Sequence, residues 1–377
     1  MNTRTPILEQ DQKLDIIDHI SQDHTEELLT MAQSHYPQQQ ISTAKILDLF
    51  HEGVLVGLTY GSDHQQDEIF IPFQIEGDLE EKILYLAYAA IVEQGRDFSG
   101  TGKRFFEITG KQKISHNMIR LTVQCATPLP EYYPGYAYAF MLKSMQKSAG
   151  ANTIARSKKP WLKDKLDRLF IWLMKHLSSQ RRQKLLQNMN KDIRLYTLRK
   201  SWQSNGATFV NQGYVDIYTH DNSPGSLWAR GLQVGDVILS RSESADKHPH
   251  LAQGQALLVA DETAYPAIAG ILERWQNPLP PQLVIISAAK GEQDYFNDVQ
   301  MPAGTVVHKV VCSAQQQADK VIPIIEAIAN IDVAWSACES ESAKKIRHYL
   351  RNQRQVKGRQ NHSKGYWHFK SERGALG

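Results

Sequence analysis

The spacing of apolar residues changes twice along the chain, which divides it into three segments. The first segment has helical and strand-like patterns and predicts a small α+β domain. Between residues 13 and 36, apolar side chains recur at near-helical spacing, which predicts a helix. The β-rich pieces V-L-V-G-L-T-Y at 54–60 and I-F-I-P-F at 69–73 follow, and a second helical pattern covers 79–94. Residues 1–100 are therefore expected to form an N-terminal α+β domain.

A linker rich in glycine and polar residues at 95–103 precedes a stretch in which apolar and polar residues alternate. Short strands separated by proline and glycine turns are typical of a small antiparallel β-barrel, which we expect over 104–245. The segments that carry this pattern are I-R-L-T-V-Q-C at 119–125, R-L-Y-T-L-R at 194–199, Y-V-D-I-Y-T-H at 214–220 and G-D-V-I-L-S at 235–240.

An insertion at 156–191 interrupts the predicted barrel and combines many lysines and arginines with leucines along one side of a predicted helix. Such a basic amphipathic helix can attract an anionic membrane surface, an anionic substrate or a partner protein. We favour a helical excursion that covers one end of the barrel, because charged helix faces are usually solvated. Membrane-surface contact through 156–191 is therefore an alternative that is not favoured.

From residue 250 onward, apolar strands alternate with amphipathic helices, which indicates a parallel sheet with helices on both faces. The chain as a whole is thus predicted to be a multidomain α+β and α/β protein, with a C-terminal parallel α/β domain at 250–377. Strands are expected at 255–260, 283–287, 305–311 and 331–336, and helices at 314–329 and 339–354.

Composition narrows the class of protein without naming a function. The 377 residues exceed the usual size of a single core, and 41% hydrophobic with 22% charged residues is ordinary for a globular protein. A net charge of +3 does not indicate a nucleic-acid partner. Cys125, Cys312 and Cys338 are too few and too widely spaced for a disulfide framework, a zinc knuckle or an iron–sulfur cluster, so no metal site is assigned.

The location in the cell is expected to be cytoplasmic. The N-terminus, M-N-T-R-T-P-I-L-E-Q-D-Q, lacks the apolar core of a signal peptide, and no apolar run is long enough to span a bilayer.

The segment R-L-Y-T is the first candidate for chemistry. Successive side chains of a strand point to opposite faces, so Arg194 and Tyr196 share one face and Thr197 lies on the other. An arginine beside an aromatic ring can hold a phosphate and a flat ring together, because a guanidinium donates two parallel hydrogen bonds. The same residues could also be solvent-exposed side chains of a sheet with no ligand. The motif R-x-Y-[ST] alone is therefore weak evidence for a binding site.

Four further stretches, in this order, make the pattern specific. Together with R-L-Y-T they resemble the siderophore-interacting protein family, which are flavin-dependent ferric-siderophore reductases, over roughly residues 104–377. A barrel followed by a parallel α/β domain is also the order found in flavin reductases of the ferredoxin-reductase type. The stretches are H-D-N-S-P-G-S-L-W-A-R-G-L-Q-V-G-D at 220–236, L-L-V-A-D-E-T-A-Y-P-A-I at 257–268, A-W-S-A-C-E at 334–339 and K-G-Y-W-H at 364–368.

The resemblance implies FAD as a cofactor and assigns its contacts. Arg194 would bind the pyrophosphate, the ring of Tyr196 would pack on the isoalloxazine, and the catalytic Thr197 would lie close to flavin N5. A second flavin segment with a turn before a helix N-terminus would also contact the cofactor, while Trp228 is interpreted as core. The other implied cofactor-binding residues are His220, Pro224, Gly225 and Ser226 in this segment, and Tyr366 and Trp367 in the tail that folds back over the flavin.

NAD(P)H would bind in the C-terminal domain. Asp261 and Thr263 open a helix directly after a strand, where the phosphates or ribose of a nicotinamide cofactor could dock. The alternative is that both residues only cap the helix, and capping and cofactor binding are compatible. Cys338 is assigned as a catalytic neighbour of hydride transfer, with a buried structural thiol as an equal alternative.

The substrate would be an anionic ferric siderophore, drawn in by positive charge near the C-terminus. The candidate substrate-binding residues are Lys344, Arg347, Lys364 and Arg373. The N-terminal domain resembles, more loosely, a small domain of haem-utilisation proteins, through D-H-I-S-Q-D-H at 18–24. His19 and His24 lie on different sides of a straight helix, so they are interpreted as packing and capping histidines rather than as haem ligands.

The sequence therefore predicts an NAD(P)H-dependent flavoprotein that reduces Fe(III)-siderophore to Fe(II) and releases iron in the cytoplasm. In such an enzyme the cofactor supplies the redox chemistry. The alternatives are a general NAD(P)H flavin or quinone reductase, and a haem- or iron-binding trafficking protein. The siderophore type and the choice between NADH and NADPH stay open.

Overall fold

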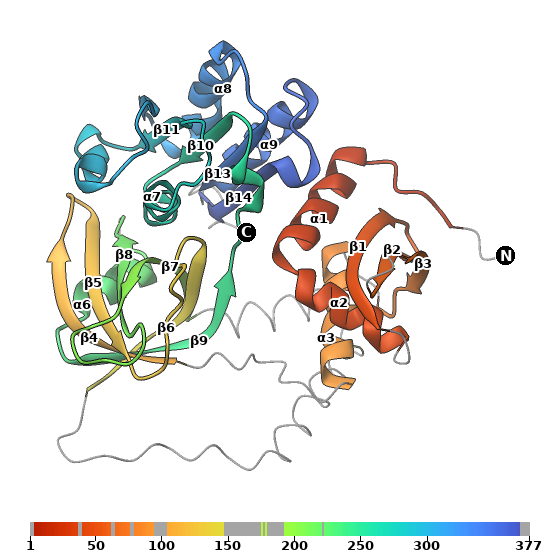
Figure 1. Cartoon of the computed structure of the whole chain (residues 1–377), viewed down its shortest axis with the longest axis horizontal. Coiled ribbons are helices and arrows are strands. Elements are labelled where there is room, and N and C mark those ends of the chain that lie inside the picture. Colours follow the sequence, from red (N-terminus) through yellow and green to blue (C-terminus); the bar gives the residue numbers. More distant parts are fainter. Residues whose placement is uncertain are drawn as a thin grey trace. The chain divides into compact units, whose positions relative to one another are not determined.

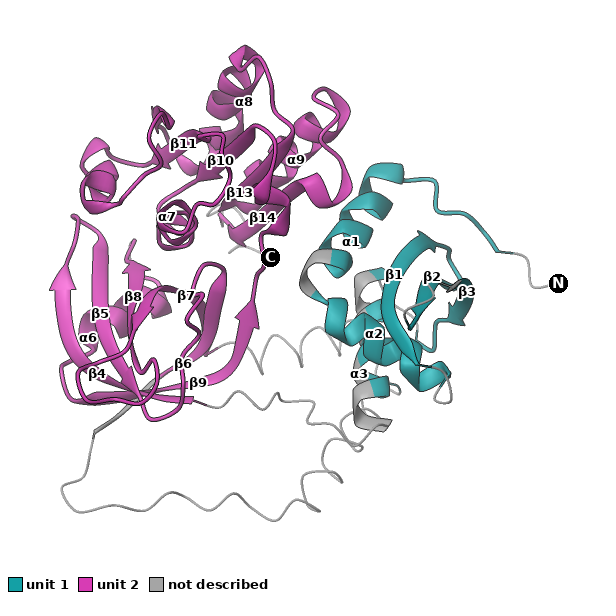
Figure 2. Cartoon of the chain, viewed as in Figure 1, with its two compact units in different colours: residues 1–101, 150–191 teal, residues 102–149, 192–377 magenta. Residues whose placement is uncertain are grey.

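The computed structural model describes residues 4–36, 40–61, 65–75, 79–93, 104–146, 192–220 and 222–369, together with Lys175 and Ser178. The chain divides into two compact units, residues 1–101 with 150–191 and residues 102–149 with 192–377 (Figure 2). The linker expected at 95–103, nearly all of the helical insertion expected at 156–191, and Arg373 lie outside the described residues. None of the described helices is long and apolar enough to cross a membrane.

The N-terminal unit has the expected α+β composition. Its three strands form an antiparallel sheet in the order β1-β2-β3, and helix α2 contacts both α3 and β1 around one apolar core. The elements are α1 (Gln10–Asp23), α2 (Thr25–His35), β1 (Ile41–Leu49), β2 (Gly53–Tyr60), β3 (Gln65–Pro72) and α3 (Leu79–Glu93).

The prediction of a single helix at 13–36 is wrong, because the helix is interrupted at His24. The φ of −129° and ψ of 34° at His24 are not helical, and its N–H donates to the carbonyl of Ile20 at 3.0 Å. The carbonyl of His24 in turn accepts from the N–H of Leu28 at 2.9 Å, which opens α2. The bend brings the rings of His19 and His24 into edge contact at 5.2 Å, which a straight helix would not allow.

The predicted antiparallel barrel is confirmed. Six strands close in the order β4-β5-β8-β7-β6-β9, and every described pair of neighbours is antiparallel. Alternate side chains, such as Phe106 with Ile108 and Leu121 with Val123, fill the interior. The elements are β4 (Arg104–Lys113), β5 (Met118–Cys125), β6 (Tyr136–Gln146), β7 (Ile193–Trp202), β8 (Gln212–Tyr218), the helix α6 (Pro224–Gly231) and β9 (Asp236–Ala245).

The predicted parallel sheet is also confirmed, in the order β12-β11-β10-β13-β14. Its chain order reverses between β10 and β13, and ligands of such sheets bind in the crevice outside the carboxyl ends of the strands at this switch point. The strands are β10 (Ala256–Ala260), β11 (Gln282–Ser287), β12 (Val306–Val311), β13 (Val333–Glu339) and β14 (Asn361–Trp367). The helices are α7 (Tyr265–Glu273), α8 (Gln317–Ala327) and α9 (Ser340–Asn352), with the 3₁₀ turns η1 (Pro249–Ala252), η2 (Lys290–Asp298), η3 (Ala314–Gln316) and η4 (Gly358–Gln360).

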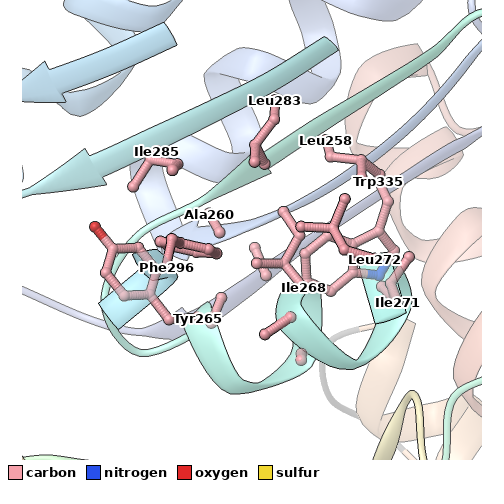
Figure 3. Close-up of a cluster of buried hydrophobic side chains, with 14 of the residues drawn as sticks. Leu258, Ala260, Tyr265, Ile268, Ile271, Leu272, Leu283, Ile285, Phe296 and Trp335 are labelled. Atoms are coloured by element: carbon pink, nitrogen blue, oxygen red, sulfur yellow. The ribbon is translucent and has the colours of Figure 1, made fainter. Parts of the chain in front are cut away.

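Each face of the sheet has its own apolar core. On one face Tyr265 and Ile268 of α7 pack with Phe296 and Trp335 (Figure 3), and α7 also contacts strand β7 of the barrel. The opposite face packs on α8 and α9. The barrel and the sheet, expected as separate domains, therefore share one compact unit, with α7 between β10 and β7 (Figure 1).

Candidate active site

Arg194 and Tyr196 converge on the start of helix α6. A Cβ atom placed on Gly225 would lie 2.5 Å from the hydroxyl of Tyr196 and 3.7 Å from Cγ of Arg194. Both side chains therefore project from the same face of β7, as their alternation along the strand requires. Because a side chain at position 225 would collide with the Tyr196 hydroxyl, glycine allows the three residues to pack closely, and we call them the clamp.

The ring of Tyr196 is held by other aromatic rings. It stacks on Trp228 of α6 with 5.9 Å between centroids and 5° between planes, and Phe140 of β6 lies 6.5 Å away. Burial raises the pKa of Tyr196 to about 12, so its hydroxyl stays protonated at neutral pH. The contacts of Trp228 with Tyr196 and Phe140 support its interpretation as core.

The first turn of α6 presents backbone donors beside the clamp. Ser223 caps the helix, its hydroxyl accepting from the N–H of Ser226 at 3.3 Å, and Pro224 begins the helix. The buried Ser226 hydroxyl donates to the carbonyl of His220 at 2.8 Å, which fixes the turn to the end of β8. The positive end of a helix dipole thus lies close to Cγ of Arg194, whose guanidinium donates to the carbonyl of Ile193 at 2.7 Å, and both groups can attract an anion.

A second group of predicted residues meets at the switch point of the sheet. The indole Nε1 of Trp367 donates to Oδ2 of Asp261 at 2.7 Å, and the ring of Trp367 lies 5.5 Å from that of His220. Oδ1 of Asp261 accepts from the N–H and the hydroxyl of Thr263 at 3.0 and 2.6 Å. Residues from the barrel, β10 and β14 therefore come together here, as a shared site requires.

Asp261 is completely buried, and its oxygens accept hydrogen bonds from three residues. Gln317 of α8 supplies the third, with Nε2 at 3.2 Å from Oδ2. Burial raises the pKa of Asp261, and these hydrogen bonds act in the opposite direction. The carboxylate thus orients Thr263 and Trp367, and no side-chain bond from it caps α7.

Glu262, between Asp261 and Thr263, is also buried at this edge. Its Oε1 accepts from the N–H of Ala288 at 2.5 Å and lies 3.4 Å from the hydroxyl of Tyr218 in β8. Burial raises the pKa of Glu262 to about 7, so the carboxyl is partly protonated at neutral pH.

Comparison with known proteins finds a family match in the C-terminal part of the chain. Residues 253–370 match the model of the family described as "Siderophore-interacting protein". The matched segment contains Asp261 and Trp367.

Two curated relatives and one solved structure are similar to the chain. The ferric acinetobactin reductase of Acinetobacter baumannii is 26% identical over 177 residues, which are 46% of this chain and 60% of that protein. The mycobactin import ATP-binding/permease protein IrtA of Mycobacterium tuberculosis is 27% identical over 161 residues, 41% of this chain and 18% of that protein. The chain thus matches less than two thirds of the length of either relative.

The structure of the siderophore-interacting protein from Acinetobacter baumannii has a TM-score of 0.52 and 19% identity, covering 73% of this chain and 94% of that one. This similarity shows that the two proteins share a fold.

Thr197 is 8% exposed and follows Tyr196 on β7, so its side chain points to the opposite face of the strand from the clamp. Arg199 lies two residues further on, where the pairing of β7 with β8 is irregular, and donates to Glu273 of α7.

Cys338 is completely buried on the α8 and α9 face of the sheet, whereas its neighbour Ala337 belongs to the α7 core. Burial raises the pKa of the Cys338 thiol well above its usual value. Its Sγ donates to the carbonyl of Glu339 at 3.6 Å. Among the two open alternatives, this placement favours the structural thiol.

Three of the candidate substrate residues lie within the described part of the chain. Lys364 pairs with Oδ2 of Asp246 at 3.1 Å, and Arg347 donates to the carbonyl of Ser363. Lys344 is exposed on α9. Tyr366 is 37% exposed, with its ring 6.5 Å from that of Trp335.

The sequence analysis missed a histidine cluster around Asp246, just after β9. Nε2 of His248 and Nε2 of His362 lie 3.4 and 3.2 Å from Oδ2 of Asp246, and His250 stacks on His362 at 5.6 Å. These partners hold the pKa of Asp246 well below its usual value against the effect of burial. No group of three or more histidine, cysteine or acidic side chains suited to a metal occurs within the described parts of the chain.

A small cavity lies beside His24 in the N-terminal unit. Nδ1 of His24 lies 3.6 Å from a carboxylate oxygen of Glu27. The cavity next to these residues measures about 10 Å³, about the space of one water molecule. It is lined by Ile20, His24, Glu27, Leu28, Met31, Ile83 and Ala87.

Proposed function

We propose that the protein is an NAD(P)H-dependent flavoprotein that binds FAD at the clamp and reduces the Fe(III) of a siderophore to Fe(II), which releases iron in the cytoplasm. The observation that carries the proposal is the convergence of Arg194 and Tyr196 on Gly225 at the start of α6. The family match of residues 253–370 and a curated relative named as a ferric acinetobactin reductase support it.

The residues of the clamp fit the chemistry of FAD. A diphosphate needs positive charge and N–H donors, which the Arg194 guanidinium and the first turn of α6 supply together. A side chain at Gly225 would collide with the hydroxyl of Tyr196 and displace its ring. A planar ring system needs a flat apolar surface, and the rigid, neutral Tyr196 supplies one.

The chain's own residues bind and orient, while FAD, when bound, accepts a hydride from a nicotinamide and donates single electrons to Fe(III). Arg194 would hold the diphosphate, Tyr196 would exclude water from one side of the ring system, and Thr197 would face the nicotinamide side. Fe(II) binds hard oxygen ligands less tightly than Fe(III), so reduction weakens the chelate.

NAD(P)H would bind at the crevice between the carboxyl ends of β10 and β13. Thr263 and Trp367 lie at this crevice, both oriented by Asp261. A carboxylate beside a phosphate would repel it, and the raised pKa of Glu262 reduces this repulsion near neutral pH. The crevice therefore suits an anionic dinucleotide.

The absorption spectrum of the purified protein tests the cofactor directly. We expect flavin bands, restored by adding FAD to protein from which the flavin was removed. Arg194→Ala should weaken FAD binding by about tenfold or more, because a charge-assisted bidentate contact is lost. Lys200→Ala, an exposed lysine on the same strand, is the control and should bind FAD as tightly as the wild type. A colourless protein that takes up no FAD would refute the proposal.

Turnover with NADH and with NADPH on a ferric hydroxamate, a ferric catecholate and a quinone separates the substrate classes. Preferred reduction of one ferric chelate supports the ferric-siderophore reductase. Equal or faster reduction of the quinone would favour the general flavin or quinone reductase.

A further inference from the structure

A connected set of buried charged and phenolic side chains crosses from the barrel to the parallel sheet. Its first member is an ion pair inside the barrel wall, between Arg120 of β5 and Asp216 of β8. Nε and Nη2 of Arg120 donate to the two carboxylate oxygens of Asp216, each at 2.7 Å. The Asp216 side chain has no exposed surface.

A second ion pair joins the barrel to α7. Nη1 and Nη2 of Arg199, which is 4% exposed, donate to the two oxygens of Glu273 at 2.9 and 2.6 Å. The hydroxyl of Tyr133, from the loop between β5 and β6, donates to the same carboxylate at 3.0 Å. Arg199 and Tyr133 belong to the barrel, whereas Glu273 ends the helix that packs on the sheet.

Tyr295 of η2 connects the two ion pairs. Its hydroxyl donates to Oδ2 of Asp216 at 2.7 Å and accepts from Nε of Arg199 at 3.1 Å. Both hydrogen-bond partners of the buried Tyr295 hydroxyl are therefore in the barrel, although Tyr295 itself belongs to the sheet domain. We call these six residues the interface network.

The interface network specifies geometry more than it adds stability. Burying charges costs desolvation free energy, which a well-placed partner roughly offsets, so such pairs are weak evidence for net stability. Apolar contacts are non-directional and tolerate small shifts of one layer over another. Hydrogen bonds at 2.6–3.1 Å do not tolerate such shifts, because their geometry is directional. If one layer shifted, the carboxylates of Asp216 and Glu273 would lose their donors while still largely shielded from water.

We propose that Tyr295 and Glu273 are positioning residues that fix the face of β7 bearing Thr197 against the carboxyl edge of the parallel sheet. The proposal rests on the proposed function, in which one ring system binds on the barrel and the other on the sheet. Thr197 lies two residues before Arg199 on β7, and both side chains are buried. Since a reaction between two bound rings is sensitive to tenths of an ångström, a small loss of this alignment slows hydride transfer.

Tyr295→Phe is the variant that isolates this role. It removes only the hydroxyl and leaves Arg120 with Asp216 and Arg199 with Glu273 as pairs. The ring keeps its contacts with Tyr265 at 5.6 Å and Phe296 at 5.4 Å.

Tyr265→Phe is the matched control. Its buried hydroxyl donates to the carbonyl of Ile286 at 2.7 Å, inside the sheet domain. Each variant removes one buried phenolic hydroxyl from the same core. Tyr265→Phe loses one hydrogen bond inside the sheet domain, whereas Tyr295→Phe loses two hydrogen bonds to the barrel.

Residual dipolar couplings of backbone amides test the alignment without any cofactor. We expect one alignment tensor to fit the barrel and the sheet of the wild type and of Tyr265→Phe, and two different tensors to be needed for Tyr295→Phe. A single tensor identical to that of the wild type in Tyr295→Phe would overturn the proposal. Glu273→Gln, which keeps the shape of the side chain, gives a second measurement if Tyr295→Phe does not fold.

Stopped-flow reduction of the flavin by a nicotinamide deuterated at the transferred position tests the consequence. We expect Tyr295→Phe to reduce its flavin about 3–10-fold more slowly, with a changed deuterium isotope effect, and Tyr265→Phe to match the wild type. Equal rates and isotope effects in all three proteins would contradict a positioning role. A wild type that binds no flavin would refute the proposed function, while the dipolar couplings would still decide the alignment.

Discussion

Trp367 and Asp261 lie 106 positions apart in the sequence and meet through a hydrogen bond of 2.7 Å from the indole Nε1 to Oδ2. This contact joins β14, an edge strand of the sheet, to the carboxyl end of the central strand β10. It also brings the indole ring against His220 of the barrel. One side chain thereby connects both parts of the candidate active site.

Replacing Trp367 with Phe should destabilise the protein. The variant keeps an aromatic ring beside His220 but leaves a completely buried carboxylate with one donor fewer. The expected loss is about 1–3 kcal/mol in the free energy of unfolding, measured by urea denaturation. Trp202→Phe is the control, since its indole donates at 2.9 Å to the neutral, part-buried Gln212. A Trp367→Phe protein as stable as the wild type would show that the contact carries little energy.

Gly225→Ala should weaken FAD binding while the fold is kept. The added methyl group would lie 2.5 Å from the hydroxyl of Tyr196, whose ring cannot move freely because it stacks on Trp228. We expect the dissociation constant for FAD, measured by fluorescence titration, to rise about tenfold, which is about 1.4 kcal/mol. Gly231→Ala at the other end of α6, where nothing lies within 4 Å of a new Cβ, is the control. Unchanged affinity in Gly225→Ala would place the cofactor elsewhere.

His250 should make the protein less stable in mild acid. Burial lowers its pKa from 6.5 to about 3, with His362 and His248 acting in the same direction and Asp246 opposing them. The folded state therefore keeps His250 neutral at a pH where the unfolded state binds a proton, so stability falls as the pH drops from about 6.5 toward 3.

His250→Phe, which can keep the stack on His362, should remove roughly 1–2 kcal/mol of the stability lost between pH 7 and pH 5. The measurement is urea denaturation at both pH values. The exposed His116, replaced with Gln, is the control and should keep the wild-type pH dependence. A His250→Phe protein that loses as much stability as the wild type would show that another group carries the effect.

Cys338→Ser should leave the rate of NAD(P)H oxidation unchanged. The thiol is buried against the α8 and α9 core rather than toward α7 and the barrel. The variant should lose about 1–3 kcal/mol of stability, because a hydroxyl is more costly to bury than a thiol. Labelling of the native protein with a thiol reagent should modify the partly exposed Cys312 first. A tenfold fall in oxidation rate would restore Cys338 as a neighbour of the nicotinamide.

The sequence predicted the architecture well where burial produces a clear period. Strands β4 and β5 alternate because one face of a barrel wall is buried, and β10 reads as five apolar residues because both faces of a parallel sheet are covered. The shared face of Arg194 and Tyr196 followed from the same geometry.

Other features left no local signal. Strand β14 reads N-H-S-K-G-Y-W and was expected only as a tail, because an edge strand need not be apolar on both sides. The break at His24 has neither glycine nor proline to mark it. The face on which Cys338 lies could not be predicted either, because every residue of β13 is buried and no alternation shows. Arg199 and Glu273 are 74 positions apart, a distance over which composition says nothing about contact.

The strand order of the sheet also has a consequence for biosynthesis. During synthesis, Asp261 leaves the ribosome 106 residues before Trp367, whose indole donates to its carboxylate. Until then this carboxylate lacks that donor, so the crevice at the switch point takes its final form only after β14 has joined the sheet.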